Sequence, residues 1–303
     1  MGAEPFMEAS DGGVGHAPSL AGGVGWGLGK CGRQVVAAFT KPLWRFPYPM
    51  KWRISKNTWV ALLAGAALAA AGGACGRLVV GDDRVAAARK EKGAAVRDLF
   101  AAKKLAYPPR SLFLRAFKDE RTLEIWAADD PAKPMQWIKS YRIAAMSGDL
   151  GPKRREGDRQ APEGFYRIDR FNPKSSYHLS LGLNYPNASD RILSDRDRPG
   201  SDIFIHGAEV SIGCLAMTDP MIQEIYVMAW DARQAGLKAI PVHIFPTRLD
   251  AAGLERLRQN RNLRQHLDFW ENLASGYRLF EKTKLVPKVT VDKRGAYVFE
   301  GAK

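Results

Sequence analysis

The sequence predicts a mainly β fold with flanking helices, and three features support this class. From Ser111 onward, apolar and polar residues alternate in several short runs, as they do in strands with one buried face. Gly, Pro, Asn and Asp residues separate these runs. Only a few longer segments show the spacing of amphipathic helices. Many short strands with few helices indicate a mostly antiparallel β domain.

Each expected strand is short. Residues 112–116 and 123–127 alternate on either side of the charged turn 118–121, which predicts a hairpin. The other expected strands cover residues 135–143, 164–168, 177–183, 203–206, 239–245 and 297–299.

Three segments are expected to be helical. Residues 82–105 are charged and rich in Ala, and their partial apolar stripe predicts a helix that leads into the domain. Residues 219–235 predict the main helix. Residues 254–273 predict one amphipathic helix that carries His266 on its exposed polar face. The aromatic-rich end that follows fits a hydrophobic core better than a sugar-binding surface.

The first eighty residues carry the features of an export signal. Residues 1–49 are rich in Gly and Ala without periodicity, which predicts either disorder or an extension upstream of the true start at Met50. Basic residues then precede an uncharged run at 57–76. Residues 50–80 therefore predict a signal peptide or a membrane anchor, and Cys75 leaves lipidation as a third alternative.

The chain is strongly basic. Its net charge is +14, from 46 basic and 32 acidic residues among 303. A cationic surface suits nucleic acid, an anionic membrane or an anionic polymer. No nucleic-acid fold signature accompanies the charge, so we expect no nucleic-acid partner and instead a soluble surface that tolerates carboxylate-rich partners.

Residues 201–220 combine a histidine, two glycines and a cysteine in the manner of a nucleophile site. The apolar run 203–205 delivers His206, and Cys214 closes the loop that follows. Because a thiol reacts as its thiolate, an imidazole that accepts the proton forms the minimal activated nucleophile with it. Taken alone, a single cysteine and a histidine at a strand end are more often structural.

The residues around Cys214 extend this hypothesis. Turns at Gly207 and Gly213 can bring the thiol and the imidazole together, and the amides near Gly213 and Cys214 can bind an oxyanion. Ser211 orients the histidine, supports the loop or only forms a turn. The positive end of the 219–235 helix is expected to favour the thiolate.

Several motifs form a family pattern. Around the cysteine they are His206-Gly207, Ser211-x-Gly213-Cys214 and Ala216-Met217-Thr218-Asp219. Elsewhere they are Gly151-Pro152-Lys153, Glu156-Gly157-Asp158, residues 162–166, Asn172-Pro173 with Ser175 and Tyr177, and residues 184–187 with Asp190. Together they resemble the L,D-transpeptidase catalytic domain (the YkuD family), and more narrowly its YafK-like murein L,D-transpeptidase branch. The resemblance runs from about residue 110 to the C-terminus.

One position departs from the wider family. Most of its members carry a second histidine directly before the Gly-Cys pair, where this chain has Ile212. The eight-residue spacing from His206 to Cys214 suits the YafK-like branch. His206 is therefore the expected general base.

The resemblance implies a β-sandwich-like catalytic domain in which Cys214 attacks a peptidoglycan stem peptide and forms a thioester. The chain would then be a cysteine-dependent L,D-transpeptidase of cell-wall biogenesis and cell shape, whose acceptor is an amine of another stem or of an anchored lipoprotein. With water as acceptor it would be an L,D-carboxypeptidase or a murein amidase. A non-catalytic peptidoglycan-binding module is the remaining alternative.

The expected organisation has five segments: an extension at 1–49, a signal or anchor at 50–80, a helical linker at 81–109, the L,D-transpeptidase-like catalytic domain at 110–250, and a helical and aromatic extension at 251–303 that packs on it.

Four residues are candidates for substrate contact. Lys153 and Arg159 lie in the cationic loop 147–160, which either attracts substrate carboxylates or is simply solvated. Tyr177 and His178 belong to an expected strand. His178 has the character of a structural residue, although it could line the cleft.

Neither a metal nor a cofactor is expected, because the five histidines are scattered and no cluster has ligand spacing. After Cys75 the only cysteine is Cys214, so its thiol stays free in an oxidising compartment. We therefore expect an exported protein of the periplasm or cell envelope, with membrane association through residues 57–76.

Overall fold

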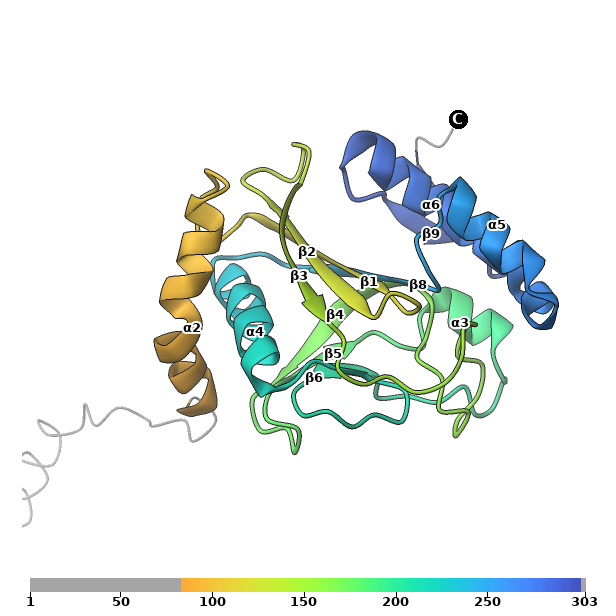
Figure 1. The fold of residues 1–303 in the computed structure, drawn as a ribbon, viewed down its shortest axis with the longest axis horizontal. Helices are drawn as coiled ribbons and strands as arrows, with labels where there is room; N and C mark the ends of the chain where they lie inside the picture. The colour runs from red at the N-terminus through yellow and green to blue at the C-terminus, as the bar shows by residue number, and fades with distance from the viewer. Residues whose placement is uncertain (1–82, 301–303) are drawn as a thin grey trace, which may run out of the picture. The chain divides into compact units, whose positions relative to one another are not determined.

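The computed structural model describes residues 83–300 (Figure 1). The extension at 1–49 and the signal or anchor at 50–80 lie outside the described residues. Between residues 83 and 300, no helix is both long enough and apolar enough to cross a membrane.

An eight-stranded sheet forms the centre of the fold, in the order β3-β2-β1-β8-β4-β5-β6-β7. Its strands are β1 Ser111–Phe117, β2 Thr122–Ala128, β3 Gln136–Arg142, β4 Gly164–Asn172, β5 Ser180–Leu183, β6 Phe204–His206, β7 Leu215–Ala216 and β8 Pro241–Phe245. A second sheet pairs β9 Val289–Val291 with β10 Tyr297–Phe299. Most pairs are antiparallel, and β1 with β8 and β6 with β7 are parallel.

Helices flank this sheet. They are α2 Asp83–Ala101, α3 Ala188–Leu193, α4 Asp219–Gln234, α5 Ala251–Gln259, the 3₁₀ helix η1 Arg261–His266 and α6 Leu267–Thr283. The predicted class, mainly β with flanking helices, is confirmed (Figure 1).

Strand β4 joins the two halves of the sheet. Its first residues pair with β8 and its last residues with β5. The register with β5 shifts between Ile168 and Arg170, and such a bulge bends a strand and increases its twist. The sheet therefore curls around one apolar cluster, to which strands of both halves contribute.

The strand expected at 177–183 is shorter than predicted. Only Ser180–Leu183 form it, whereas His178 has a φ of +67°. A residue in the left-handed region cannot continue an extended strand. Tyr177 and His178 therefore belong to the loop before β5, and the prediction that they lie in a strand is wrong.

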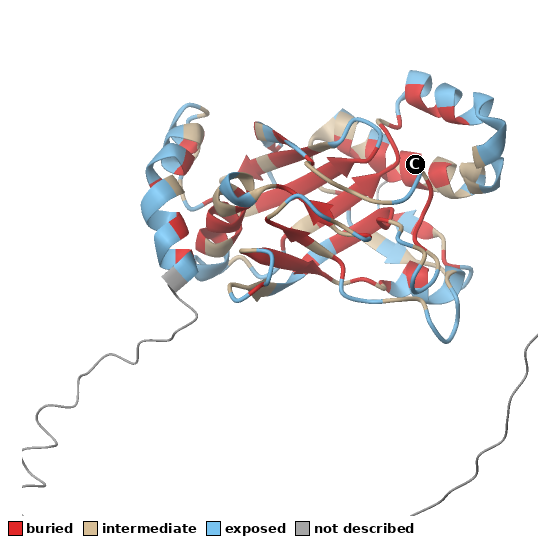
Figure 2. Cartoon of the chain, turned by 60° about the horizontal axis from the view of Figure 1, so that its bottom comes forward, coloured by how far each residue is buried: buried red, intermediate tan, exposed pale blue. Residues whose placement is uncertain are grey.

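Helices α2 and α4 pack on each other. In α4, Ile222 and Ile225 are buried in the main apolar cluster, and in α2 Val96 and Phe100 are buried in the same cluster. Burial of each such side chain contributes about 1.5–3 kcal/mol. The apolar stripe predicted for residues 82–105 thus faces the domain rather than solvent. Figure 2 shows that buried residues are concentrated in the strands of the central sheet.

The opposite face of the sheet is also covered. From β1, Leu112 and Leu114 join the main cluster, whereas Phe117 packs in a second cluster with Trp270 and Tyr277 of α6. Successive strand residues point to opposite faces. The alternation in this part of the sequence therefore reflects two apolar layers, and β1 is buried almost throughout.

The C-terminal region is not the single helix predicted for 254–273. Asn260 separates α5 from η1, with a non-helical ψ of 102° and a side chain that accepts a hydrogen bond from the Asn262 N–H. Asn competes with the helix for backbone groups in this way. His266 consequently lies half-buried beside Trp270, with ring centroids 5.4 Å apart, and not on an exposed polar face.

A buried ion pair fixes the long loop before β4. Lys118 and Glu163 are 1% and 0% exposed, and Lys118 Nζ lies 2.9 Å from Glu163 Oε1. Lys118 also donates to the carbonyls of Gly151 and Ala161, at 2.8 and 3.0 Å. Glu163 accepts from the Gly151 N–H and from Trp270 Nε1. Two charges therefore hold β1, the loop and α6 together.

Removal of this lysine is expected to destabilise the protein strongly. Lys118→Met leaves an uncompensated buried carboxylate and should cost about 3–5 kcal/mol in free energy of unfolding. Urea unfolding measures this value. The matched control is Lys288→Met, whose partner Glu300 is exposed, and it should cost less than about 1 kcal/mol. Equal costs for the two variants would contradict this account of the loop.

Candidate active site

The parallel strands β6 and β7 bring the predicted cysteine and histidine to one place. His206 ends β6 and pairs with Ala216 of β7, while Cys214 directly precedes β7. Both side chains line one cavity of about 320 Å³. This volume lies within the range of small-molecule sites, about 300–1,000 Å³.

The thiol of Cys214 lies against the start of β6. The Phe204 N–H donates to Cys214 Sγ at 3.4 Å, and the thiol faces the Asp202 carbonyl oxygen at 3.7 Å. Burial raises the pKa of the Cys214 thiol, and the Phe204 N–H and the charge of Lys153 oppose this only in part. Burial therefore opposes the thiolate expected from a nearby helix end and favours the neutral thiol.

The imidazole of His206 is held in one tautomer. The side chain is 3% exposed, and Nδ1 lies 2.6 Å from the Gly207 carbonyl oxygen. Because a carbonyl only accepts, Nδ1 carries the proton and Nε2 is the basic nitrogen. Burial lowers the pKa of His206, although the bond to Gly207 opposes the shift. The two pKa shifts thus favour a neutral thiol beside a neutral imidazole.

Ser211 shapes the loop that carries the cysteine. Its Oγ donates to the Cys214 carbonyl oxygen at 2.7 Å and accepts from the Gly213 N–H at 3.1 Å. The Gly213 amide, expected to bind an oxyanion, is therefore already engaged. Of the two amides, that leaves the Cys214 N–H as the candidate oxyanion donor.

Both glycines of the loop occupy positions that a side chain would not fit. Gly213 has a φ of +137°, and a Cβ there would lie 3.1 Å from the Gln160 carbonyl oxygen. At Gly207 a Cβ would lie 2.4 Å from Asp219 Oδ1. The expectation of turns through these glycines is consistent with this geometry.

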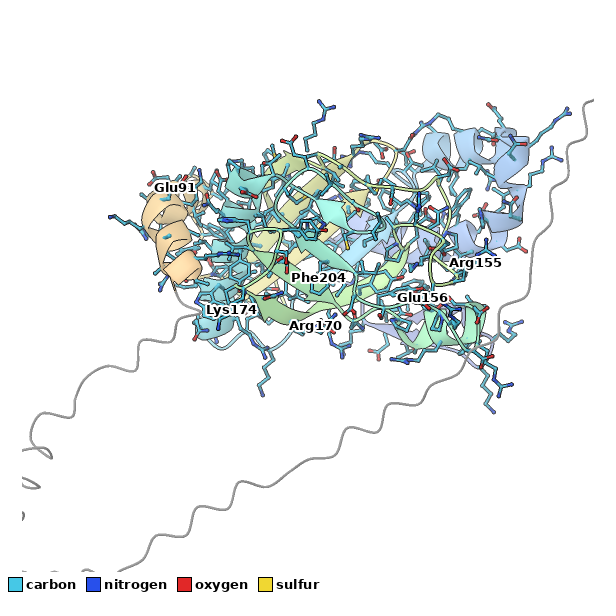
Figure 3. The ribbon with its side chains drawn as sticks, turned by 90° about the horizontal axis from the view of Figure 1, so that it is seen from below. Glu91, Arg155, Glu156, Arg170, Lys174 and Phe204 are labelled. Carbon is cyan, nitrogen blue, oxygen red and sulfur yellow. The ribbon has the colours of Figure 1, made fainter. Side chains whose placement is uncertain are left out.

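A second cavity, of about 430 Å³, meets the first at the cysteine. Asp202, Ile212 and Cys214 line both. The Ile212 side chain is 80% exposed at this junction. In Figure 3, Phe204 lies between Lys174 on one side and Glu156 on the other, so the segments that bear these two residues flank β6. The thiol is thus accessible from two hollows.

The two cations predicted to contact substrate differ in their surroundings. Both line the second cavity. Lys153 is 5% exposed and donates to Asp158 Oδ1 at 2.6 Å and to the Arg155 carbonyl oxygen at 2.8 Å, so its charge is largely neutralised. Arg159 is exposed, and between residues 83 and 300 no ion pair occupies its guanidinium. Arg159 is the better candidate for an anionic ligand.

Tyr177 and His178 also differ in their position relative to the two cavities. Tyr177 lines the first cavity and packs on the imidazole of His206, with ring centroids 4.8 Å apart. His178 lines neither of the two cavities, and its Nε2 is buried. The structure therefore brings Tyr177 to the site and keeps His178 behind it.

Arg84 is a residue that the sequence interpretation missed. From the first turn of α2, its Nη1 donates to the carbonyls of Ser175 and His178 at 2.7 and 2.8 Å. These bonds span the loop that carries Tyr177, whose own carbonyl accepts from the Gly207 N–H at 3.0 Å. No local pattern signals this role, because the loop lies about ninety residues away in the sequence.

In the part of the chain that the structure describes, no group of three or more His, Cys, Asp or Glu residues could hold a metal ion. Cys214 is a free thiol there. A thiol and an imidazole that line one cavity are suited to nucleophilic and acid–base chemistry.

Comparisons with known proteins identify the family of the chain. A family model for the L,D-transpeptidase catalytic domain, YkuD, matches residues 115–242. The protein named "Putative L,D-transpeptidase YafK" from Escherichia coli strain K12 is 39% identical over 189 residues, which cover 62% of this chain and 73% of that protein. Its namesake from E. coli O157:H7 matches equally. The chain belongs to the YkuD family of L,D-transpeptidase catalytic domains.

Solved structures overlap partially with the fold. The helical cell shape determining protein Pgp2 of Campylobacter jejuni is 18% identical, with a TM-score of 0.36 over 60% of this chain and 73% of that one. Bd1075 of Bdellovibrio bacteriovorus is 18% identical, with a TM-score of 0.35 over 62% and 79%. L,D-transpeptidase 1 of Mycobacterium tuberculosis is 14% identical, with a TM-score of 0.24 over 45% and 62%.

The neutral state of Cys214 predicts slow alkylation at neutral pH. Because its pKa is raised, a smaller fraction is thiolate at pH 7 than in a free cysteine. Iodoacetamide labelling across a pH series, followed by peptide mass spectrometry, should give a midpoint for Cys214 above about 8.5, the ordinary value. An unstructured cysteine peptide in the same tube is the reference. A midpoint below that of the reference would overturn the neutral-pair description.

Arg84→Ala is expected to loosen the loop that carries Tyr177. Misplacement of groups around a reacting centre by about 1 Å can reduce turnover by about 100-fold, so a loss of about 10- to 100-fold in kcat/KM, measured by steady-state kinetics, is expected. The control is Arg89→Ala on the same helix, which loses an ion pair to Asp231 instead. Equal effects of the two substitutions, or a full loss of folding by circular dichroism, would show a general helix-docking role rather than positioning of the site.

Proposed function

We propose that this chain is a cysteine-dependent L,D-transpeptidase that acts on peptidoglycan stem peptides through a thioester acyl-enzyme. The observation that carries the proposal is the shared cavity of Cys214 and His206, with His206 Nδ1 held against the Gly207 carbonyl oxygen. Membership of the L,D-transpeptidase family supplies the substrate class.

The first half-reaction forms the thioester. Cys214 Sγ attacks the carbonyl on the L-centred side of an L,D-peptide bond, while its proton passes to His206 Nε2. The carbonyl oxygen takes up the electron pair and is stabilised by the Cys214 N–H. As the C–N bond breaks, the imidazolium of His206 gives its proton to the departing amine.

The second half-reaction reverses these transfers. An amine of another stem, or of an anchored lipoprotein, attacks the thioester carbonyl and gives a proton to His206. The C–S bond breaks, and the proton returns to the sulfur. Because both resting groups are neutral, no charge pair has to be stored in the buried site between turnovers.

The two cavities support separate places for the two halves of the substrate. His206 and Tyr177 line only the first cavity, so the departing and attacking amines belong there. The second cavity, with exposed Arg159, suits the retained acyl part and its carboxylates. Residues 50–80 would carry the enzyme to the periplasm or envelope, where this substrate lies, with membrane association through residues 57–76.

The experiment is mass spectrometry of tetrapeptide muropeptides after incubation with the purified protein. Cross-linked or amino-acid-exchanged products are expected with the native chain, and Cys214→Ser should abolish them. The matched control, Cys75→Ser, should retain them. His206→Ala should lower the rate by about 10²–10⁴-fold, the usual contribution of a general base.

The products also separate the alternatives. Trimmed stems alone, dependent on Cys214, would make the protein an L,D-carboxypeptidase, and release of a linked protein or peptide would make it a murein amidase. Products that do not differ between the native chain and Cys214→Ser would contradict the proposed enzyme and favour a peptidoglycan-binding module.

A further inference from the structure

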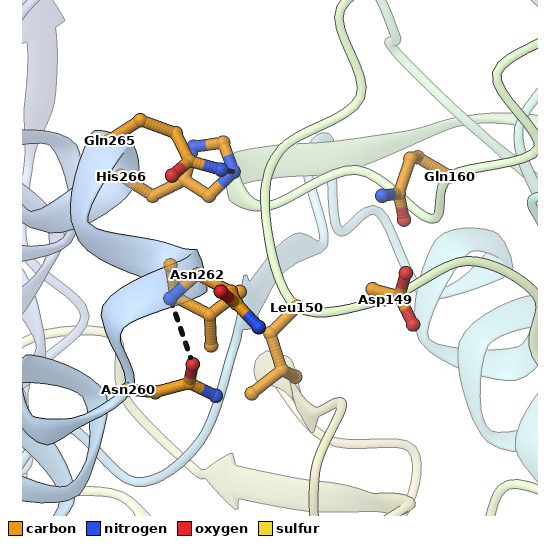
Figure 4. Close-up of a pocket in the computed structure, with 8 residues that line it drawn as sticks. Asp149, Leu150, Gln160, Asn260, Asn262, Gln265 and His266 are labelled. Carbon is orange, nitrogen blue, oxygen red and sulfur yellow. Dashed lines mark hydrogen bonds between the residues drawn. The ribbon is translucent and has the colours of Figure 1, made fainter.

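A third cavity lies apart from the cysteine, between the loop 147–160 and the helices of the C-terminal region. Its volume is about 500 Å³. Four carboxamide side chains line it, those of Gln160, Asn260, Asn262 and Gln265, with Asp149, His266 and two leucines (Figure 4).

The chemistry of this lining favours a neutral polar ligand. A carboxamide both donates and accepts hydrogen bonds, which matches hydroxyl and acetamido groups. No lysine or arginine lines the cavity, and Asp149 disfavours anions. Burial lowers the pKa of His266, so this ring adds no positive charge at neutral pH. Leu150 and Leu263 supply apolar contact for C–H faces.

The polar groups are partly arranged in advance. Asn260 Oδ1 accepts from the Asn262 N–H at 3.1 Å, the bond drawn in Figure 4, and Gln265 Nε2 lies 3.3 Å from His266 Nε2. Gln160 Oε1 is buried and has no protein partner among the described residues. That oxygen is turned toward the backbone at Gly148, where a Cβ would lie 2.0 Å from it, so the remaining carboxamides and Asp149 are the groups that a ligand in the cavity can reach.

Gln160 connects this cavity to the cysteine loop. Its side chain lines the third cavity, while its carbonyl oxygen lies 3.1 Å from the position of a Cβ on Gly213. The residue next to it, Arg159, lines the second cavity. A polymer with a saccharide part and a peptide part could therefore occupy both sides of this thin wall at once.

We propose that the third cavity binds a neutral N-acetylated saccharide, the glycan portion of the polymer whose stem peptide reaches Cys214. The identity of that polymer rests on the proposed function, whereas the class of ligand is inferred from the residues that line the cavity. With this site, the enzyme binds stem peptides that are linked to glycan in preference to free stem peptides.

Binding is tested on the full chain with tri-N-acetylchitotriose, by isothermal titration calorimetry and saturation-transfer NMR. Saturable binding is expected, and Asn262→Leu and Gln265→Leu should each weaken it at least tenfold. Both residues are exposed, so these changes should leave the fold intact. Gln136→Leu, on the exposed face of β3, is the matched control and should bind like the native chain.

The outcomes are distinct for the site and for the proposed reaction. No saturable saccharide binding, equal affinity in Asn262→Leu, or binding of only the sugar-free stem tetrapeptide would each overturn the saccharide site. Binding that persists in Cys214→Ser, alongside muropeptide products that do not depend on Cys214, would retain the site and contradict the reaction. If both hold, Asn262→Leu should raise KM for glycan-linked stems at least tenfold and leave KM for the free tetrapeptide unchanged.

Discussion

The buried contact between Lys118 and Glu163 is the constraint on which the site depends. The pair lies under the loop between β3 and β4, and binds it through Gly151 and Ala161. Gln160 directly precedes Ala161, and its carbonyl oxygen lies 3.1 Å from the position that a Cβ on Gly213 would take. Gly213 also has a φ of +137°, which favours glycine. The salt bridge just after the C-terminal end of β1 therefore holds the loop that packs against the residue before Cys214. Buried ion pairs contribute little net stability, but loss of one partner is costly, so such a pair fixes a geometry firmly.

The same burial that fixes the geometry sets the protonation of the site. It raises the pKa of the Cys214 thiol and lowers that of His206, and both shifts favour neutral groups. Reactivity then depends on proton transfer at the moment of attack rather than on a stored thiolate. Tyr177 packs on the imidazole, and Arg84 holds the loop that carries Tyr177. The Gly207 carbonyl accepts the Nδ1 proton, which leaves Nε2 as the basic nitrogen. The arrangement ties the start of α2 to the reacting groups.

The sequence predicts those features that depend on neighbours in the chain. The hairpin of β1 and β2 and the helix α4 follow from local patterns in the sequence, and the glycine spacing is consistent with His206 and Cys214 lining one cavity. The sequence does not predict features that depend on partners far apart in the chain. Lys118 reads as a turn residue because Glu163 is far along the chain, and Arg84 as a solvated charge because its loop is more distant still. The break at Asn260 is missed since one asparagine barely alters an amphipathic pattern. The engaged Gly213 amide needs the actual rotamer of Ser211.

Intact-protein mass spectrometry during turnover tests the central claim most directly. The native chain, quenched with acid while it processes tetrapeptide muropeptides, should carry a covalent acyl adduct. Proteolysis should place the adduct on the Cys214 peptide, and hydroxylamine should remove it, as expected of a thioester. The adduct should be absent from Cys214→Ser. Turnover without any adduct on Cys214, or an adduct at another residue, would contradict the account.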